Sequence, residues 1–269
     1  MKRVLTALTA GSLAIAAIVL LESFWLFWVA LALLQGCAIE YLRLGRRVHA
    51  ELPRAIFLLV LPAVALLWLA AAPSPAVLPL AALAGSPLLF AVALLARGGT
   101  PASAVGALGW LSFGLPYLVL PVWALYELHR QSRWVLLGLL VAVWANDSVA
   151  FWVGSTWGRR KLAPRLSPNK TWEGALGGLV GGSLIGLAAL WWMIGRQPSW
   201  TLGAILVVSI VAAQLGDLVE SMLKRAAAVK DSGALFPGHG GLLDRLDAII
   251  LAVPVFYGLF GATGLAAEL

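Results

Sequence analysis

Three residues with metal- and phosphate-binding side chains share one predicted helical face. Asp217, Ser221 and Lys224 are spaced at i, i+4 and i+7, so a helix carries them on one side. A carboxylate inside a membrane-crossing helix is costly and normally faces a cavity or a partner. The pattern therefore predicts a polar wall that runs from the apolar part of the chain toward its surface.

Further carboxylates follow at close range. Asp231 lies in the polar stretch after this helix, and Asp244 and Asp247, three residues apart, share a side of the next predicted helix. Magnesium binds a few carboxylates together with water and substrate phosphate oxygens. Carboxylates at a helix start also stabilise the helix dipole, an alternative that suits Asp244 or Asp247 taken alone. Together with Asp217, these residues predict a Mg²⁺ site that leaves room for a second cation.

A glycine-rich turn lies between these carboxylates. Residues 237–241 read Pro-Gly-His-Gly-Gly, and Gly240 and Gly241 permit close approach of backbone N–H groups to phosphate oxygens. Arg245 adds a side chain that binds phosphate through two parallel hydrogen bonds. His239 is either a proton shuttle or a neutral hydrogen-bonding group that fixes the turn, and both alternatives stay open.

Two connections in the chain are long and polar, whereas most others are only a few residues long. They cover residues 154–173 and 220–247, and function is expected there. Asp147 lies in the apolar run before the first of them. It is a functional candidate, and the alternative is an interhelical hydrogen bond.

Two stretches resemble recurrent segments of phosphatidate cytidylyltransferases. Residues 221–247 read SMLKRAAAVKDSGALFPGHGGLLDRLD and match the family pattern S-x-x-K-R-x₄-K-D-x-G-x₃-P-G-H-G-G-x-x-D-R-x-D without departure at a fixed position. Residues 147–158, followed by SPNKTWEG at 167–174, are similar to a second family segment that ends S-P-x-K-T-x-E-G. The resemblance covers the C-terminal half of the chain, while the N-terminal spans are similar only in being hydrophobic.

The resemblance implies transfer of a cytidylyl group in phospholipid biosynthesis. The phosphate of phosphatidic acid attacks the α-phosphorus of CTP, which releases pyrophosphate and forms CDP-diacylglycerol. A phosphate monoester is already an anionic nucleophile, so catalysis rests on positioning and charge neutralisation. CTP and phosphatidic acid are therefore the expected substrates, and Mg²⁺ is the expected cofactor.

Roles follow for the residues that match the family patterns. The expected catalytic residues are Asp217, Lys224, Asp244, Arg245 and Asp247, and the expected metal ligands are Asp217, Asp244 and Asp247. The expected substrate-binding residues are Ser167, Lys170, Thr171, Glu173, Ser221, Arg225, Lys230, Asp231, His239, Gly240 and Gly241. The side chains expected to neutralise phosphate charge are Lys224, Arg225, Lys230 and Arg245, and the 167–173 group completes the pocket from the other loop.

Composition excludes an ordinary soluble domain. Of the 269 residues, 61% are hydrophobic and 12% are charged, whereas soluble domains are usually about 45–50% apolar. Backbone groups in lipid must be satisfied within each segment, which favours helices over open sheets and predicts an all-α, polytopic bundle. The net charge of +7 comes from residues in short loops, so anionic lipid or phosphate is expected as a partner and nucleic acid is not.

Nine apolar runs have about the 20-residue length that a bilayer-crossing helix needs. They span residues 4–21, 24–42, 54–72, 77–96, 104–125, 134–153, 174–194, 200–219 and 248–267. Sixteen of the 19 Lys and Arg residues fall on the inner side if the N-terminus is cytoplasmic. This predicts a multi-pass protein of a bacterial-type inner membrane, with both long loops in the cytoplasm. The first run is favoured as a retained span over a signal peptide.

The chain is expected to divide into N-terminal helices, residues 1–130, and a catalytic region, residues 131–269. The N-terminal part would supply lipid access or an oligomer interface, and a homodimer is left open. Glu40, beside a basic cluster at residues 43–47, would contact anionic headgroups or belong to an ordinary positive-inside anchor. Gly174, Gly178 and Gly182, with neighbouring glycines, predict close packing against another helix.

Three alternative functions stay open. A transporter or channel would distribute charge along a pore, whereas here the charge is concentrated in two loops on one predicted side. A neighbouring CTP-using lipid enzyme, such as a polyprenol kinase or an archaeal-type synthase, would share the nucleotide. A homologue without turnover would retain the fold, although none of the charged motif residues is missing.

Overall fold

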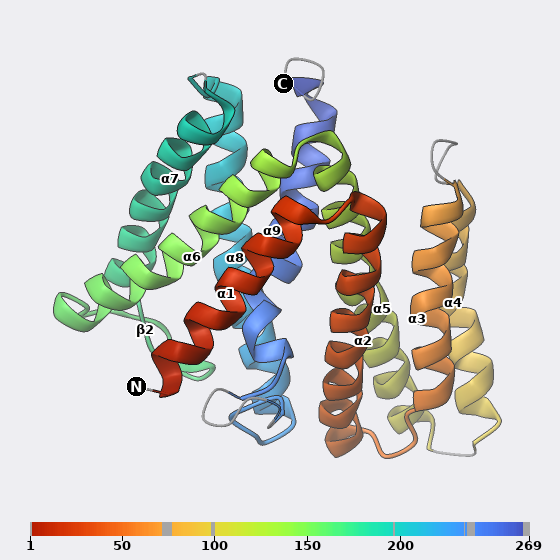
Figure 1. Ribbon diagram of the computed structural model, residues 1–269. Coiled ribbons are helices and arrows are strands. Elements are labelled where there is room, and N and C mark those ends of the chain that lie inside the picture. The colour runs from red at the N-terminus through yellow and green to blue at the C-terminus, as the bar shows by residue number, and fades with distance from the viewer. Residues whose placement is uncertain are drawn as a thin grey trace. The chain divides into compact units, whose positions relative to one another are not determined.

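The described part of the chain is almost entirely helical. The computed structural model describes residues 2–71, 77–97, 100–195, 197–233, 235 and 240–265 (Figure 1). The helices in this part are α1 (Lys2–Leu20), α2 (Ser23–Val48), α3 (Arg54–Ala71), α4 (Val77–Leu95), α5 (Pro101–Gln131), α6 (Arg133–Thr156), α7 (Trp172–Ile194), α8 (Trp200–Ala226) and α9 (Leu243–Ala262). Each expected span corresponds to one of these helices.

Helix length and composition make this an all-α polytopic membrane protein. Seven of the described helices, namely α2 and α4 to α9, contain stretches long and apolar enough to cross a bilayer. The other two contain the shorter apolar stretches Gly11–Leu20 and Arg54–Ala70. The count of nine spans and the cytoplasmic N-terminus therefore stay predictions.

The chain forms two compact units that interleave along the sequence. The first unit contains residues 1–26, 124–222 and 246–269, and the second contains residues 27–123 and 223–245. The motif stretch at residues 221–247 is therefore divided between the units. Residues 223–245 belong to the second unit, and the residues at both ends of the stretch belong to the first. The functional division at residue 130 stays a prediction.

In the first unit, α6 and α7 lie side by side (Figure 1) and pack through glycines. A Cβ atom on Gly178 would lie 2.8 Å from the carbonyl oxygen of Asn146, and one on Gly182 would lie 2.8 Å from that of Ala142. These are backbone atoms, which cannot move aside cheaply. The predicted close packing of the seventh span is confirmed, and its partner is the preceding helix.

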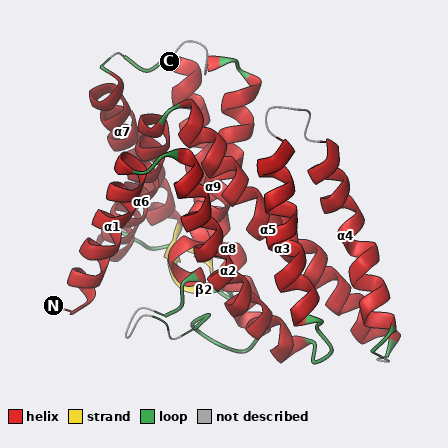
Figure 2. Ribbon diagram, turned by 45° about the vertical axis from the view of Figure 1, so that its right-hand side comes forward, coloured by secondary structure: helices red, strands yellow, loops and turns green. Residues whose placement is uncertain are grey.

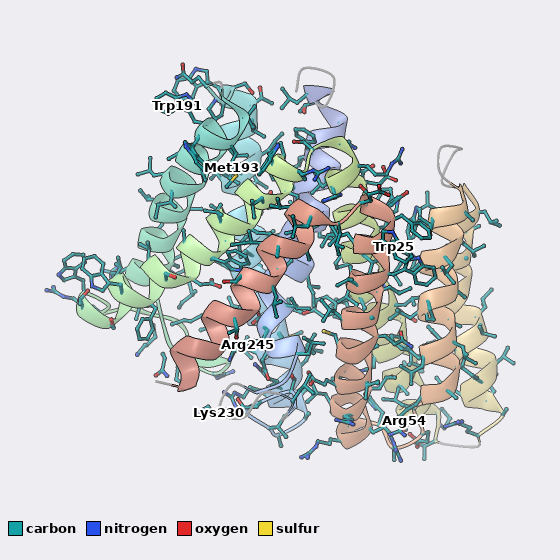
Figure 3. The ribbon with its side chains drawn as sticks, viewed as in Figure 1. Trp25, Arg54, Trp191, Met193, Lys230 and Arg245 are labelled. Atoms are coloured by element: carbon teal, nitrogen blue, oxygen red, sulfur yellow. The ribbon has the colours of Figure 1, made fainter. Side chains whose placement is uncertain are left out.

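Large aromatic side chains are exposed near the end of α7. Trp191 (Figure 3) and Trp192 lie in its last turn, and Trp200 begins α8. Tryptophan favours the boundary between lipid and water, where its ring is apolar and its N–H can meet a polar group. The two helix ends that flank the α7–α8 connection therefore have the composition of a membrane interface.

The connection from α6 to α7 contains a short antiparallel hairpin that the sequence did not predict (Figure 2). Strands β1 (Lys161–Ala163) and β2 (Ser167–Thr171) pair with Lys161 opposite Thr171. The expectation of helices was derived for segments that cross lipid, and a connection outside the span is not bound by it. The hairpin leads directly into α7.

In the second unit, an aromatic core surrounds the buried Tyr41 of α2. Its ring stacks on Phe57, which in turn stacks on Phe90. The Tyr41 hydroxyl donates to the carbonyl oxygen of Trp110 over 2.7 Å, and Gly114 leaves room for the tyrosine ring. These contacts join α2, α3, α4 and α5.

Replacing Gly182 by alanine is expected to destabilise the protein by about 1–3 kcal/mol, because the new methyl group meets the α6 backbone. The matched control is Gly258→Ala in α9, where a Cβ meets nothing within 4 Å. That change should leave stability equal or slightly higher. Thermal unfolding in detergent measures both, and equal midpoints would contradict the packing role of Gly182.

Candidate functional site

The first unit brings together residues from the two long polar stretches. Lys170, at the end of β2, forms an ion pair with Asp217 of α8. The hydroxyl of Ser221, one turn further along α8, lies 3.5 Å from the other oxygen of Asp217. Asp147 of α6 interacts electrostatically with both Asp217 and Lys170. Two carboxylates, an ammonium and a hydroxyl therefore form one polar cluster, which we call the Asp217 cluster.

A pair of amide side chains supports this cluster. Gln214 of α8 donates to the side-chain oxygen of Asn146 over 2.7 Å and to the carbonyl oxygen of Ala175 over 2.9 Å. Asn146 in turn donates to Asp147 over 3.0 Å. The interhelical bonds expected as an alternative for Asp147 are thus made by Asn146 and Gln214. Sequence reasoning missed both amides, although each is a polar residue within an apolar helix.

The hairpin places its polar residues at the start of α7. Thr171 is the N-cap residue, and its hydroxyl oxygen accepts from the backbone N–H of Gly174 over 3.1 Å. The Glu173 carboxylate accepts from the backbone N–H groups of Arg159 and Arg160, at 3.0 and 3.2 Å. In this arrangement, Thr171 and Glu173 hold the hairpin against α7 and thereby place Lys170. Ser167, at the other end of β2, pairs with Ala163.

The second unit holds a different ion pair. Lys224, near the end of α8, lies 2.6 Å from Oδ1 of Asp244, in the first turn of α9. Their side chains are 13% and 8% exposed. Removing one partner of a pair this buried leaves an uncompensated charge and costs about 3–5 kcal/mol. Both residues therefore have a structural role beside any chemical one.

Asp244 also organises the chain before α9. Its Oδ2 accepts from the backbone N–H groups of Ser232 and Gly241, at 2.9 and 2.6 Å. Gly240 has a φ of 78°, in the left-handed region that favours glycine, and a Cβ there would meet Oδ2 of Asp244. The Gly241 amide, expected to face phosphate, donates to a carboxylate in this structure.

The remaining predicted residues lie mostly at the surface. Arg225, Lys230, Asp231 and Arg245 are exposed, and Figure 3 labels Lys230 and Arg245. Arg225 donates to the carbonyl oxygen of Val229 over 3.1 Å. Asp247 is partly exposed in the first turns of α9, and its carboxylate accepts from the N–H of Ala248 over 2.8 Å. His239 lies outside the described residues.

The contacts of Glu40 differ from both expectations. Glu40 was expected to contact lipid headgroups or to belong to a positive-inside anchor. Its side chain is instead only 5% exposed, and it accepts hydrogen bonds from the backbone N–H groups of Leu242 and Leu243. The sequence feature that could have indicated this buried role is an acidic residue within an apolar run. Ser232 also contacts Glu40, but no sequence feature indicated this contact, because Ser232 occupies a variable position of the motif.

The donor set fits Mg²⁺ in part. Among the described residues, no three His, Cys, Asp or Glu side chains gather into a metal site of their own. Mg²⁺ draws on water and phosphate oxygens, so one or two carboxylates suffice. Asp217 fits, because it is one-third exposed and its Oδ1 receives a long hydrogen bond. Asp244 fits only if its contact with Lys224 opens.

Comparisons with known proteins show which proteins this chain is similar to. A model of the cytidylyltransferase family matches residues 1–262. A Pseudomonas aeruginosa protein named phosphatidate cytidylyltransferase is 40% identical over 162 residues, which cover 58% of this chain and 59% of that protein. Proteins of the same name from Haemophilus influenzae and Staphylococcus aureus are 42% and 40% identical over 130 residues. These matches cover 47% and 48% of this chain.

The chain spans only about half the length of these curated relatives. The covered shares are 59%, 45% and 50% for the three proteins. Their names describe proteins of which this chain matches a part, whereas the family match extends over nearly all of it.

Loss of the Thr171 hydroxyl should weaken the junction between the hairpin and α7. We expect Thr171→Val to lower stability by about 0.5–2 kcal/mol, because the Gly174 N–H loses its acceptor. Thr171→Ser retains the oxygen and is the matched control. Thermal unfolding in detergent separates the two, and an equal loss in both would show that the methyl group, not the cap, matters.

Proposed function

Since the chain belongs to the cytidylyltransferase family, we propose that it transfers the CMP group of CTP to phosphatidic acid and forms CDP-diacylglycerol. The relatives that share this name support the choice of substrates. The observation that carries the proposal is the ion pair between Lys170 and Asp217 in the first unit. It connects the family-like segment at residues 167–174 to the face of α8 that Asp217 shares with Ser221, the first residue of the other segment.

The proposed reaction is an in-line substitution at phosphorus. A phosphate oxygen of phosphatidic acid forms a bond to the α-phosphorus of CTP, and the bond from that phosphorus to the bridging oxygen of the β-phosphate breaks. The electron pair leaves with pyrophosphate. The nucleophile is already anionic, so the protein has to bring two negatively charged groups together. Positive side chains and well-placed donors meet this requirement.

Residues of the first unit have the chemistry for the charged end of the substrates. Lys170 carries positive charge beside Asp217, and Ser221 adds a hydroxyl. Asp217 would hold Mg²⁺, which when bound supplies positive charge to the phosphate oxygens. A substrate phosphate would compete with Asp217 for Lys170, so binding would release this carboxylate for the metal.

Residues of the second unit supply further phosphate-binding groups. Arg225, Lys230 and Arg245 are exposed cations, and Lys224 is held by Asp244. Asp244, and Asp247 of the first unit, remain proposed metal ligands in addition to Asp217, with a second cation included in the proposal. His239, Gly240 and the other motif residues remain proposed substrate contacts.

The proposed setting is the inner membrane of a bacterial cell, with the site on the cytoplasmic side. The basic residues concentrated in the two long polar stretches support this orientation. Phosphatidic acid would enter from the bilayer and the product would stay there. Nucleic acid is not proposed as a partner, and a homodimer is left to measurement.

The test of the function is transfer of label from CTP into lipid. Purified protein in detergent receives phosphatidic acid, CTP labelled in its α-phosphate, and Mg²⁺, and the organic phase is counted. We expect label only with phosphatidic acid and metal, and none with EDTA. No transfer would contradict the proposed function. Label transferred from γ-labelled CTP to diacylglycerol would instead favour a kinase.

Asp217→Asn should lower turnover by about 100-fold or more, because the charged ligand is lost while size and shape are kept. The matched control is Glu22→Gln, which removes a carboxylate at an exposed position and should retain wild-type turnover. Thermal unfolding checks that both variants are folded. Asp244→Asn is a poorer test, because it also breaks the buried pair with Lys224. Full activity of folded Asp217→Asn would refute the role of Asp217.

A further inference from the structure

Glu40 of α2 is a buried carboxylate that binds a segment far along the chain. Its Oε1 accepts from the backbone N–H of Leu242 over 3.0 Å, and its Oε2 accepts from that of Leu243 over 2.9 Å. Ser232 Oγ also lies 2.9 Å from Oε2. All of these residues belong to the second unit. Glu40 thus supplies acceptors for the amide just before α9 and for the first amide of α9, which have no partner within the helix.

The surrounding chain is shaped to fit this carboxylate. A Cβ atom on Gly233 or Gly241 would overlap the Glu40 side chain. One turn earlier on α2, a Cβ on Gly36 would lie 2.8 Å from a methyl group of Leu242. Close backbone approach is therefore needed on both sides of the contact. Such a fit indicates a fixed geometry for the segment before α9.

The same segment determines the position of Asp244. Three consecutive backbone amides are divided between two carboxylates, because Gly241 donates to Asp244 while Leu242 and Leu243 donate to Glu40. Ser232 Oγ lies 2.9 Å from an oxygen of each carboxylate and has one proton to donate. The two acidic side chains are thereby held at a set separation.

We propose that Glu40 is a positioning residue for the reaction and acts through Asp244. It binds the amides of Leu242 and Leu243, which directly follow the Gly241 amide that donates to Asp244. It also contacts the Ser232 hydroxyl, which lies beside Asp244, and Asp244 in turn holds Lys224. The inference rests on the proposed function, in which Lys224 and Asp244 act on the phosphates or their metal. Glu40 itself, enclosed by the chain, has no contact with substrate in this role.

Glutamine at position 40 tests the proposal with little change in shape. Each carboxylate oxygen of Glu40 receives a backbone N–H, so either orientation of the Glu40→Gln amide turns a donor toward a donor. We expect kcat to fall about 10- to 100-fold, as is typical when a supporting hydrogen-bond partner is lost. KM for CTP should change less than kcat, because the interactions that are lost stabilise mainly the transition state.

Two controls separate positioning from loss of stability or charge. Phe90→Leu loosens a fully buried ring of the same unit, stacked on Phe57 and outside the site, so it lowers the unfolding midpoint and should keep kcat within about 2-fold. Glu22→Gln removes an exposed carboxylate and should change neither quantity. Wild-type kcat in Glu40→Gln overturns the proposal. So does an equal loss of kcat in Phe90→Leu at an equal shift of the midpoint.

Hydrogen–deuterium exchange provides a readout that is independent of turnover. In Glu40→Gln, the amides of residues 241–243 should exchange about tenfold faster than in the wild type, and this increase should be absent from Phe90→Leu. Unchanged exchange of these amides in Glu40→Gln overturns the positioning role even if activity falls. Faster exchange with an inactive wild-type enzyme supports the placement by Glu40 and refutes the proposed function instead.

Discussion

Every charge carried into the apolar part of this chain has to be matched by donors or by an opposite charge. Burying an unpaired carboxylate costs several kcal/mol or more, which would consume a large part of the roughly 5–15 kcal/mol that stabilises a typical fold. Three acidic side chains meet this constraint in different ways. Asp244 is paired with Lys224, Glu40 is surrounded by amide donors, and Asp217 keeps partial exposure beside Lys170. The polar site is therefore assembled from groups that also stabilise one another.

Glycine makes these arrangements sterically possible. In the first unit, the glycines of α7 let the helix approach the α6 backbone, next to Asn146 and Asp147. In the second unit, Gly233 and Gly241 leave space for Glu40, and Gly240 adopts a positive φ beside Asp244. The glycines of the motif thus have packing roles in addition to any contact with phosphate. A phosphate-binding interpretation by itself would miss the carboxylates that already occupy these amides.

Family membership and geometry contribute different parts of the functional conclusion. The family match extends along nearly the whole chain and indicates the class of chemistry. The geometry shows which motif residues bind the backbone and which ones lie at the surface. Thr171 and Glu173 bind backbone amides, whereas Arg225 and Lys230 extend from the surface. Lys170 and Asp217 combine both properties, because they interact with each other and stay partly exposed.

The sequence by itself determined the helical architecture, the membrane setting, the two motif stretches and the packing role of the α7 glycines. These properties depend on local composition and on short-range periodicity, which hydrophobic runs of 20 residues display directly. Only the tertiary structure decided that Gln214 reaches Asn146, that Lys170 meets Asp217 and that Glu40 binds the backbone at the start of α9. Those contacts join residues up to about 200 positions apart, and no spacing rule encodes which distant donor will satisfy a given buried acid. The short hairpin also depended on tertiary context, because its few residues carry no strand pattern and its last residue, Thr171, is the N-cap residue of α7.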